Sequence, residues 1–212
     1  MKYMTPDTKE SVFSASPKLD PRLRALRAAA TQGRDPATED ETLNLLLAVA
    51  RAAAPSRILE VGTAEGLTSV ALLQECAGAR LTTVEMEEER WLRAKENFSA
   101  FGVADRVNAI LGDAADVLPS LEGQFELIFL DGPKAQYIHY LPVLKRLLPP
   151  RGVLFADDVL LYGWVDGRVP VPQKRRSIVL RIREYLNAVS ADADFITSIL
   201  RVGEGVALSV KR

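Results

Sequence analysis

The stretch RILEVGTAEGLTS, residues 57–69, passes from an apolar run through two glycines into a helical pattern. The run at 57–62 has the length and composition of a buried strand. Gly62 and Gly66 permit a tight turn in which the backbone comes close to a ligand just before a helix N-terminus. A strand, a glycine turn and a helix in this order are typical of the first βα unit of a doubly wound sheet.

The same alternation continues along the chain. Short apolar runs are followed by longer amphipathic segments, as expected for βαβ repetition. The further strands are predicted at residues 81–85, 106–111, 125–131 and 152–158, and the helices after Gly66, over 87–101, after Asp113 and over 135–148. Because the strand runs are apolar throughout, the sheet should be parallel and covered on both faces.

Both ends of the chain depart from this pattern. Helical periodicity predicts two helices before the first strand, at 21–30 and 38–53, and a late helix from about Lys174 to Val189. The last two apolar runs, FITSILRV and GVALSVKR, are joined only by Gly203, Glu204 and the Gly205 that opens the second run, which requires an antiparallel hairpin. The predicted fold is therefore α/β, with a doubly wound, Rossmann-like sheet that is mostly parallel and ends in an antiparallel hairpin.

Composition sets the broad class. A chain of 212 residues, 48% hydrophobic, is sufficient for one compact domain, in which residues 1–55 supply the N-terminal helices and 56–212 the core. The single cysteine, Cys76, excludes an intramolecular disulfide framework and a site with several thiolates. No apolar run has the length of a membrane span, and we expect a cytoplasmic protein without a membrane partner.

Acidic residues stand at or near the end of each predicted parallel strand. Ligands of doubly wound sheets bind at the carboxyl ends of the strands, so a series of acids in this position argues for a site. The series consists of Glu60, Glu85, Asp113, Asp131, Asp157 and Asp158.

The first turn indicates which ligand to expect. Residues 60–66 read E-x-G-x-x-x-G and lack the central glycine of dinucleotide-binding turns, a pattern typical of enzymes that use S-adenosylmethionine (SAM). Glu85, at the end of the next strand, is placed to accept the ribose hydroxyls, and Met86 could pack on the adenine. The alternative is an ordinary βα turn with a capping acid. The predicted cofactor-binding residues are Glu60, Gly62, Gly66, Thr68, Ser69, Glu85, Met86, Asp113, Ala114 and Asp131.

Several of these stretches resemble a known family. RILEVGTAEGLTS, TTVEMEEER, GDAADVLPSL, LIFLDGPKAQY and LFADDVLLYGWV are similar to the metal-dependent O-methyltransferases that include catechol and caffeoyl-CoA O-methyltransferases, over roughly residues 38–212. The resemblance implies that Asp131, Asp157 and Asp158 bind a divalent cation, magnesium or manganese, and that Lys134 acts as a base. Asp158 stands where the family usually has asparagine.

The implied chemistry agrees with these residue types. Methyl transfer from a sulfonium requires a partly ionised oxygen, and a hard cation held by carboxylates lowers the pKa of a hydroxyl. Lys134 could then take the proton if its own pKa is lowered, and Asp131 would contribute to catalysis through the cation. The alternative for Lys134 is a solvated surface lysine.

The acceptor is open to more than one interpretation. DGPKAQY, KRRSIVLRIREYL and DFITSILRVGEGVALSVK most resemble bacterial tRNA 5-hydroxyuridine methyltransferases, which implies that Lys174, Arg175, Arg176 and Arg181 contact tRNA phosphates. The alternative for this basic helix is a solvated face. The second hypothesis is a methyltransferase of small hydroxylated aromatic compounds, and the third a nucleotide-binding protein without methyl transfer. Relatives are often dimers, so we expect a homodimer.

Overall fold

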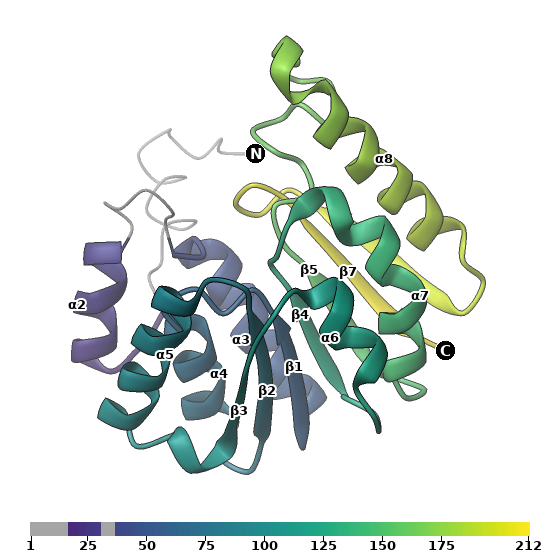
Figure 1. Ribbon diagram of the computed structural model, residues 1–212. Helices are drawn as coiled ribbons and strands as arrows, with labels where there is room; N and C mark the ends of the chain where they lie inside the picture. Colours follow the sequence, from purple (N-terminus) through teal and green to yellow (C-terminus); the bar gives the residue numbers. More distant parts are fainter. Residues whose placement is uncertain (1–16, 31–36) are drawn as a thin grey trace, which may run out of the picture.

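Seven strands form one sheet within residues 17–30 and 37–212, which the computed structural model describes (Figure 1). The strands are β1 (Arg57–Val61), β2 (Arg80–Glu85), β3 (Val107–Leu111), β4 (Leu127–Leu130), β5 (Val153–Ala156), β6 (Phe195–Leu200) and β7 (Val206–Lys211). They are ordered β3-β2-β1-β4-β5-β7-β6, with β1 to β5 parallel and β7 antiparallel to both neighbours. The predicted fold class is confirmed.

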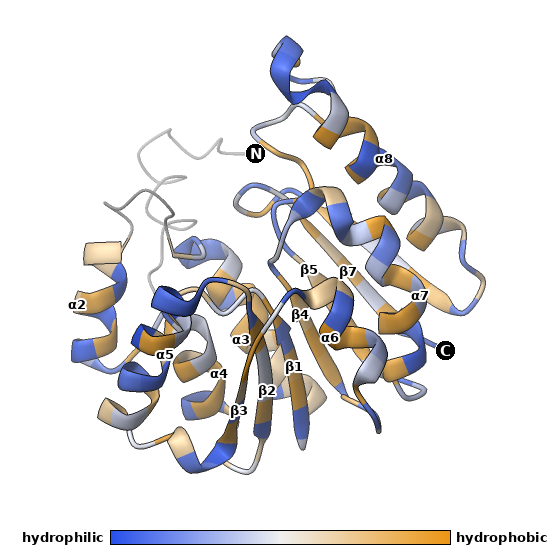
Figure 2. Cartoon of the chain, viewed as in Figure 1, coloured by the Kyte–Doolittle hydropathy of each residue, from blue (hydrophilic) through white to orange (hydrophobic). Residues whose placement is uncertain are grey.

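Helices cover both faces of the sheet. One layer holds α2 (Pro21–Ala30), α3 (Asp40–Ala53), α4 (Leu67–Glu75) and α5 (Glu88–Ala100), and the other α6 (Ala114–Ser120), α7 (Tyr137–Leu147) and α8 (Arg176–Ala191). Short 3-10 turns lie at η1 (Ala104–Arg106), η2 (Lys134–Gln136) and η3 (Gln173–Arg175). Figure 2 shows the hydrophobic residues concentrated in the strands and on the helix faces turned toward them.

The strand pleat divides the core into two clusters. Ile58 packs with the layer of α3 and α4, while the next residue, Leu59, packs with the layer of α6 and α7, and both are fully buried. Successive side chains of a strand point to opposite faces, so a strand covered on both sides is apolar at most positions. This accounts for the unbroken apolar runs in the sequence.

Several element boundaries differ from the sequence-based ones by about two residues. The helix predicted at 135–148 begins at Tyr137, because Lys134–Gln136 form the η2 turn. The late helix begins at Arg176, after the η3 turn. Parts of the predicted N-terminal helical region, residues 1–16 and 31–36, lie outside the described residues. In the described part of the chain, no helix is long and apolar enough to span a membrane.

The strand order places a switch point between β1 and β4. From β1 the chain runs outward through β2 to β3, and after α6 it returns to β4 on the opposite side of β1. The connections that leave β1 and β4 therefore diverge, and a crevice opens above the carboxyl ends of these two strands.

Candidate active site

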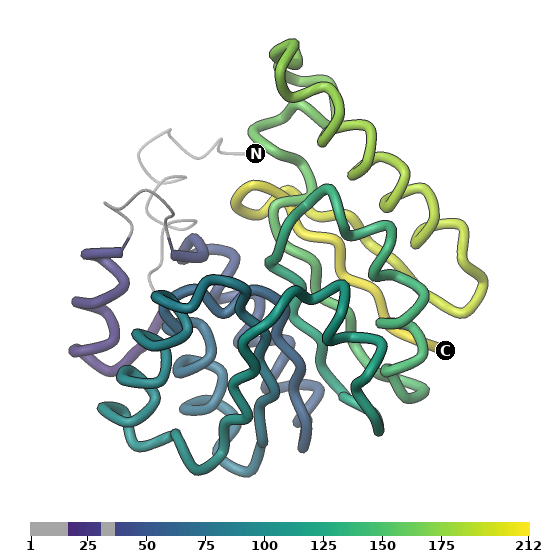
Figure 3. The backbone as a smooth tube through the Cα atoms, viewed as in Figure 1, coloured from purple at the N-terminus to yellow at the C-terminus, as the bar shows by residue number. Residues whose placement is uncertain are grey.

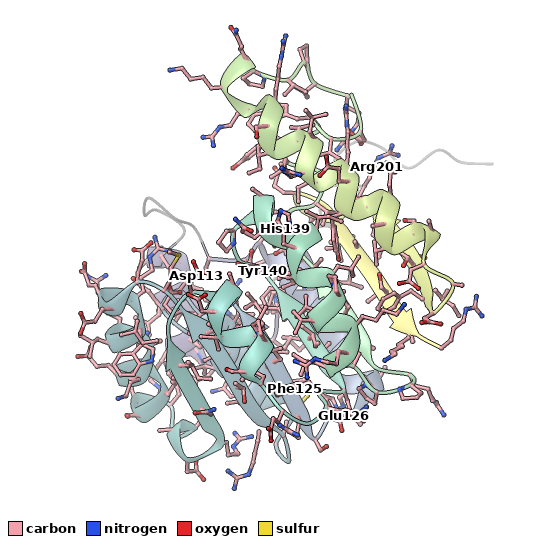
Figure 4. The ribbon with its side chains drawn as sticks, turned by 45° about the vertical axis from the view of Figure 1, so that its right-hand side comes forward. Asp113, Phe125, Glu126, His139, Tyr140 and Arg201 are labelled. Carbon is pink, nitrogen blue, oxygen red and sulfur yellow. The ribbon has the colours of Figure 1, made fainter. Side chains whose placement is uncertain are left out.

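A cavity of about 970 Å³ lies at the carboxyl ends of the parallel strands. The segments that follow β1 to β5 all line it, together with Thr38 and Glu39 before α3 and Glu204 in the β6–β7 turn. Figure 4 shows this polarity of the sheet: Asp113 and Tyr140 lie at one end of the α6–α7 layer, and Phe125 and Glu126 at the other. The acids predicted at the strand ends thus converge on one site, with the exception of Glu60.

The glycine turn after β1 forms the floor of the cavity. Gly62 has φ +97°, and a Cβ there would overlap the carbonyl oxygen of Asp131 at the end of β4. Gly66 has φ +72°, precedes the first turn of α4, and would overlap the Phe98 ring if it carried a Cβ. Only glycine fits these positions, because each combines a left-handed backbone with a close approach. The turn therefore leaves the α4 N-terminus open toward a ligand.

Glu85 connects this turn to β2. Its Oε2 accepts a hydrogen bond from the backbone N–H of Ala64 at 2.8 Å, and its Oε1 accepts from the N–H groups of Met86 and Glu87 at 2.9 and 3.0 Å. A carboxylate has about four acceptor positions, so capacity remains for a ligand hydroxyl on the cavity side. Met86 is 57% exposed and forms part of the rim. Both residues line the cavity, and their predicted contacts with the ribose and the adenine stay predictions.

Glu60 and Ser69 lie beneath the turn and do not line the cavity. The fully buried Glu60 accepts hydrogen bonds from the hydroxyls of Ser69 and Thr83, the latter at 2.6 Å. Burial raises the pKa of Glu60 to about 7, even though both hydrogen bonds lower it. Glu60 and Ser69, both predicted to contact the cofactor, therefore support the glycine turn from below. Thr68, one residue before Ser69, does line the cavity.

The far end of the cavity is formed by the start of α6. Asp113 caps this helix by accepting a hydrogen bond from the N–H of Ala115 at 2.8 Å, and both Asp113 and Ala114 line the cavity. Tyr140 of α7 also lines it, and burial together with Asp113 raises the Tyr140 pKa to about 12. No sequence pattern pointed to Tyr140 as a site residue, because it falls within an ordinary amphipathic helix.

Asp131 and Lys134 form the polar centre of the cavity. Lys134 Nζ lies 2.5 Å from Asp131 Oδ1, 3.1 Å from Asp158 Oδ2 and 3.1 Å from the Tyr137 hydroxyl. Burial lowers the pKa of Lys134, but Asp131, Tyr137, Asp158 and Asp157 raise it, and it ends well above its ordinary value. In this arrangement Lys134 is an ammonium counter-ion, and the predicted role as a base requires that these contacts loosen.

Asp157 adds a third carboxyl group. It is almost fully buried, and its Oδ1 accepts a hydrogen bond from the N–H of Asp158 at 2.7 Å. Burial, Asp131 and Asp158 raise the pKa of Asp157 to about 8. In the part of the chain that the structure describes, no three acidic, histidine or cysteine side chains form a ready-made cation site. Asp131, Asp157 and Asp158 nevertheless suit a hard cation, because their three carboxyl groups share one positive charge, that of the Lys134 ammonium.

Five residues on the other side of this centre form part of the remaining wall. They are Thr38, Glu39, Asp158, Tyr162 and Glu204, of which only Asp158 was predicted. The Thr38 hydroxyl lies 3.1 Å from that of Thr68, which holds the segment before α3 against α4. Burial, Glu204 and Asp158 raise the pKa of Glu39. The sequence offered one signal here, since Tyr162 and Glu204 both adjoin glycines of predicted loops.

The basic residues predicted to bind nucleic acid lie outside the cavity. Lys174, Arg175 and Arg176 are exposed at the N-terminal tip of α8, which projects beyond the rest of the described chain in Figure 1 and is hydrophilic in Figure 2. Arg181 forms an ion pair with Glu184 at 2.8 Å. The structure thus separates this cluster from the acidic centre instead of combining the two.

Comparisons with known proteins agree with this geometry. A family model described as O-methyltransferase matches residues 18–212. A catechol O-methyltransferase of Mycobacterium tuberculosis is 32% identical over 69% of this chain and 68% of its own, and a caffeoyl-CoA O-methyltransferase of Populus kitakamiensis is 29% identical over 92% and 88%. The structure of the O-methyltransferase TomG from Streptomyces achromogenes, involved in tomaymycin synthesis and in complex with SAM, superimposes with a TM-score of 0.81 at 27% identity, over 97% of this chain and 94% of that one.

Proposed function

The chain belongs to the O-methyltransferase family and is a SAM-dependent O-methyltransferase, and we propose that it methylates a small hydroxylated aromatic compound with the help of a divalent cation. The observation that carries the proposal is a single cavity in which the Gly62 turn and Glu85 adjoin the centre of Asp131, Lys134 and Asp157. A cofactor and an acceptor bound side by side there would bring the methyl group to the oxygen that receives it.

The cofactor would lie along the edge of the sheet. Glu85 would accept hydrogen bonds from the ribose hydroxyls, and the adenine would extend over Met86 toward Asp113 and Ala114 at the end of β3. The methionine part would then lie over the glycine turn of β1, with its carboxylate near the α4 N-terminus and Thr68. This orientation directs the sulfonium toward β4 and Asp131.

The acidic centre would hold the cation. Asp131, Asp157 and Asp158 are hard oxygen donors with surplus negative charge, and a divalent cation there supplies charge neutralisation and a lowered pKa of the acceptor hydroxyl. With Asp131 and Asp158 engaged, these carboxylates no longer raise the pKa of Lys134, and its burial favours a neutral amine.

The reaction would then proceed by direct displacement. Lys134 accepts the proton of the acceptor hydroxyl, and the oxygen attacks the methyl carbon of the sulfonium. The new oxygen–carbon bond forms as the sulfur–carbon bond breaks, and the electron pair of that bond remains on sulfur in the thioether product. Asp131 would contribute to both the cofactor side and the acceptor side of the cavity, because its backbone packs against Gly62 and its side chain faces Lys134.

Charge favours a small acceptor over a polyanion. Glu39 and Glu204 line the acceptor side in addition to Asp158, and they would repel phosphate groups at the mouth of the cavity. Tyr162 is 61% exposed and lines the cavity, and its ring would offer a flat surface to an aromatic acceptor. Transfer RNA is the second candidate acceptor, supported by the exposed cluster of Lys174, Arg175 and Arg176 at the tip of α8.

Turnover of a catechol with SAM tests the proposal. The protein should form the O-methyl ether with magnesium or manganese present, lose turnover after exhaustive treatment with EDTA, and recover when the cation is restored. Asp157→Ala should show the same loss without recovery. Full turnover in EDTA would overturn the role of the cation, and no methylation of any dihydroxy aromatic compound would overturn the acceptor class.

A further inference from the structure

The β6–β7 turn packs directly against the segment that follows β5. The N–H of Val159 donates to the carbonyl oxygen of Gly205, and that of Leu160 to the carbonyl oxygen of Glu204, both at 2.9 Å. The N–H of Tyr162 donates to the Glu204 carboxylate. Figure 3 shows the two segments side by side, the yellow turn against the green chain after β5. Two segments about 40 residues apart in the sequence thus form one wall of the cavity.

The segment after β5 is held in an unusual conformation. Asp158, Leu161 and Tyr162 have φ values of +56°, +45° and +58°, in the left-handed region that side chains with a Cβ disfavour. Such residues retain this conformation only where surrounding contacts impose it. Of the three hydrogen bonds that join this segment to the β6–β7 turn, only the one from Tyr162 is accepted by a side chain, that of Glu204.

The turn is supported in its own right on the opposite side. The Glu39 carboxylate accepts a hydrogen bond from the N–H of Glu204. A Cβ on Gly203 would overlap the carboxylate of Glu39 and the hydroxyl of Thr42, and one on Gly205 would overlap Leu160. The turn is therefore confined between α3 and the segment after β5. This packing fixes the position of the Glu204 backbone, from which the side chain reaches the Tyr162 N–H.

Tyr162 links this contact to the acceptor. Tyr162 lines the cavity, and its ring packs against Trp164, with ring centroids 5.0 Å apart and planes inclined by 57°. On the basis of the function proposed above, we propose that Glu204 is a positioning residue, whose carboxylate holds the Tyr162 backbone so that the Tyr162 ring forms the acceptor wall. The Val159 and Leu160 bonds go to backbone oxygens of the turn, so they survive a change of the Glu204 side chain.

Kinetics of matched variants test this assignment. Glu204→Ala should raise the acceptor KM about tenfold, and change kcat and the Kd for SAM less than about threefold, because the lost contact orients the acceptor wall. Glu204→Gln keeps a side-chain carbonyl that can accept the same hydrogen bond, and should stay near the wild-type KM. Glu184→Ala removes an exposed carboxylate far from the cavity and serves as the control. Equal defects in Glu204→Ala and Glu204→Gln, or a wild-type KM in Glu204→Ala, would overturn the assignment.

Hydrogen exchange gives a second readout that requires no acceptor. The peptide covering residues 158–165 should take up deuterium faster in Glu204→Ala than in wild type or Glu184→Ala, because the Tyr162 N–H loses its partner. If no small aromatic compound is methylated while this exchange accelerates, the proposed acceptor class fails and the Glu204 contact stands. Unchanged exchange in Glu204→Ala would show that Glu204 does not hold Tyr162, whatever the acceptor is.

Discussion

The two halves of the cavity are built in different ways. The cofactor half consists of turns attached to the ends of neighbouring parallel strands, and its closest contacts are made by the backbone at Gly62 and Gly66. The acceptor half brings together segments from three distant parts of the chain, at Thr38, Tyr162 and Glu204. The Tyr162 N–H donates to the Glu204 carboxylate, the Thr38 hydroxyl contacts that of Thr68 in α4, and several residues after β5 are left-handed. Changes in the first half should therefore affect every acceptor equally, while changes in the second should alter acceptor choice and leave SAM binding intact.

Removal of the divalent cation should have the largest effect and should separate the halves most clearly. Loss of several kcal/mol of transition-state stabilisation corresponds to a fall in kcat of about 10³ or more. The Kd for SAM should change by less than about threefold in the same chelated sample, because Glu85 and the glycine turn lie outside the carboxylate centre. Calorimetry and turnover measured side by side check this, and a parallel loss of SAM binding would mean that the halves are not independent.

Glu85→Ala should produce the largest defect in the cofactor half. Loss of charge-assisted hydrogen bonding from the ribose to the remaining acceptor position of Glu85 should weaken SAM binding by about 1.5 to 3 kcal/mol. Because Glu85 also accepts three backbone hydrogen bonds, the variant should melt at a lower temperature as well, which the sequence did not lead us to expect. Glu85→Gln, which keeps one carbonyl acceptor, should have a SAM affinity and a melting temperature between those of wild type and Glu85→Ala. A Glu85→Ala protein with wild-type SAM affinity would remove the ribose assignment.

Lys134→Ala should lower kcat by about 10² and leave the Kd for SAM unchanged, since the amine acts on the acceptor proton. The variant also removes the ammonium that lies between Asp131 and Asp158, so the cation-free protein should be less stable. Single-turnover kinetics with SAM prebound measure the first effect, and thermal unfolding in EDTA the second. A kcat within about threefold of wild type would show that Lys134 serves only as a counter-ion.

The difference between the halves also explains what could be predicted from the sequence. Gly62, Glu85, Asp113 and Asp131 were expected together at the strand ends and do line one cavity, because apolar runs reveal where parallel strands end, and neighbouring strand ends must meet. The alternation of side chains along the first apolar run would also have excluded Glu60 from the cavity. It lies two residues after Ile58 and so points to the same face, toward α4.

The acceptor half carries no comparable signal. The contact between Glu204 and Tyr162 joins a side chain to a backbone N–H across two loops, and neither residue belongs to a periodic pattern. The position of Lys134 between Asp131 and Asp158 likewise depends on how two turns pack. Local propensity and periodicity predict helices and strands, but they carry no information about contacts between irregular segments.

Glu60→Gln tests the support beneath the cofactor half. Because the folded-state pKa of Glu60 is raised from 4.5 to about 7, the folded protein retains a proton that the unfolded chain has released. Stability should therefore fall as the pH rises from about 4.5 to 7, with a contribution of about 3 kcal/mol at most from this group. Glu60→Gln should flatten that part of the curve, and Glu184→Gln should not. An unchanged slope in Glu60→Gln, measured by urea unfolding at several pH values, would contradict the buried carboxyl assignment.

The smallest effect is expected at the tip of α8. Replacing Lys174, Arg175 and Arg176 together by alanine should leave kcat and KM for a catechol within about twofold of wild type, because none of the three lines the cavity. Nonspecific tRNA binding should become weaker and less dependent on salt, since about one counterion is released per phosphate contact. If the triple variant instead loses methylation of a small acceptor, the α8 tip belongs to the acceptor half.

The most direct test gives the protein a choice of acceptors. Methyl-labelled SAM, magnesium, a panel of vicinal dihydroxy aromatic compounds and undermethylated bacterial tRNA should be incubated with the protein, first separately and then together. We expect label on one hydroxyl of the dihydroxy compounds, abolished by EDTA and restored by magnesium, and none on tRNA. Label that enters tRNA and no member of the panel would contradict the proposed acceptor and leave tRNA, the second candidate, as the substrate.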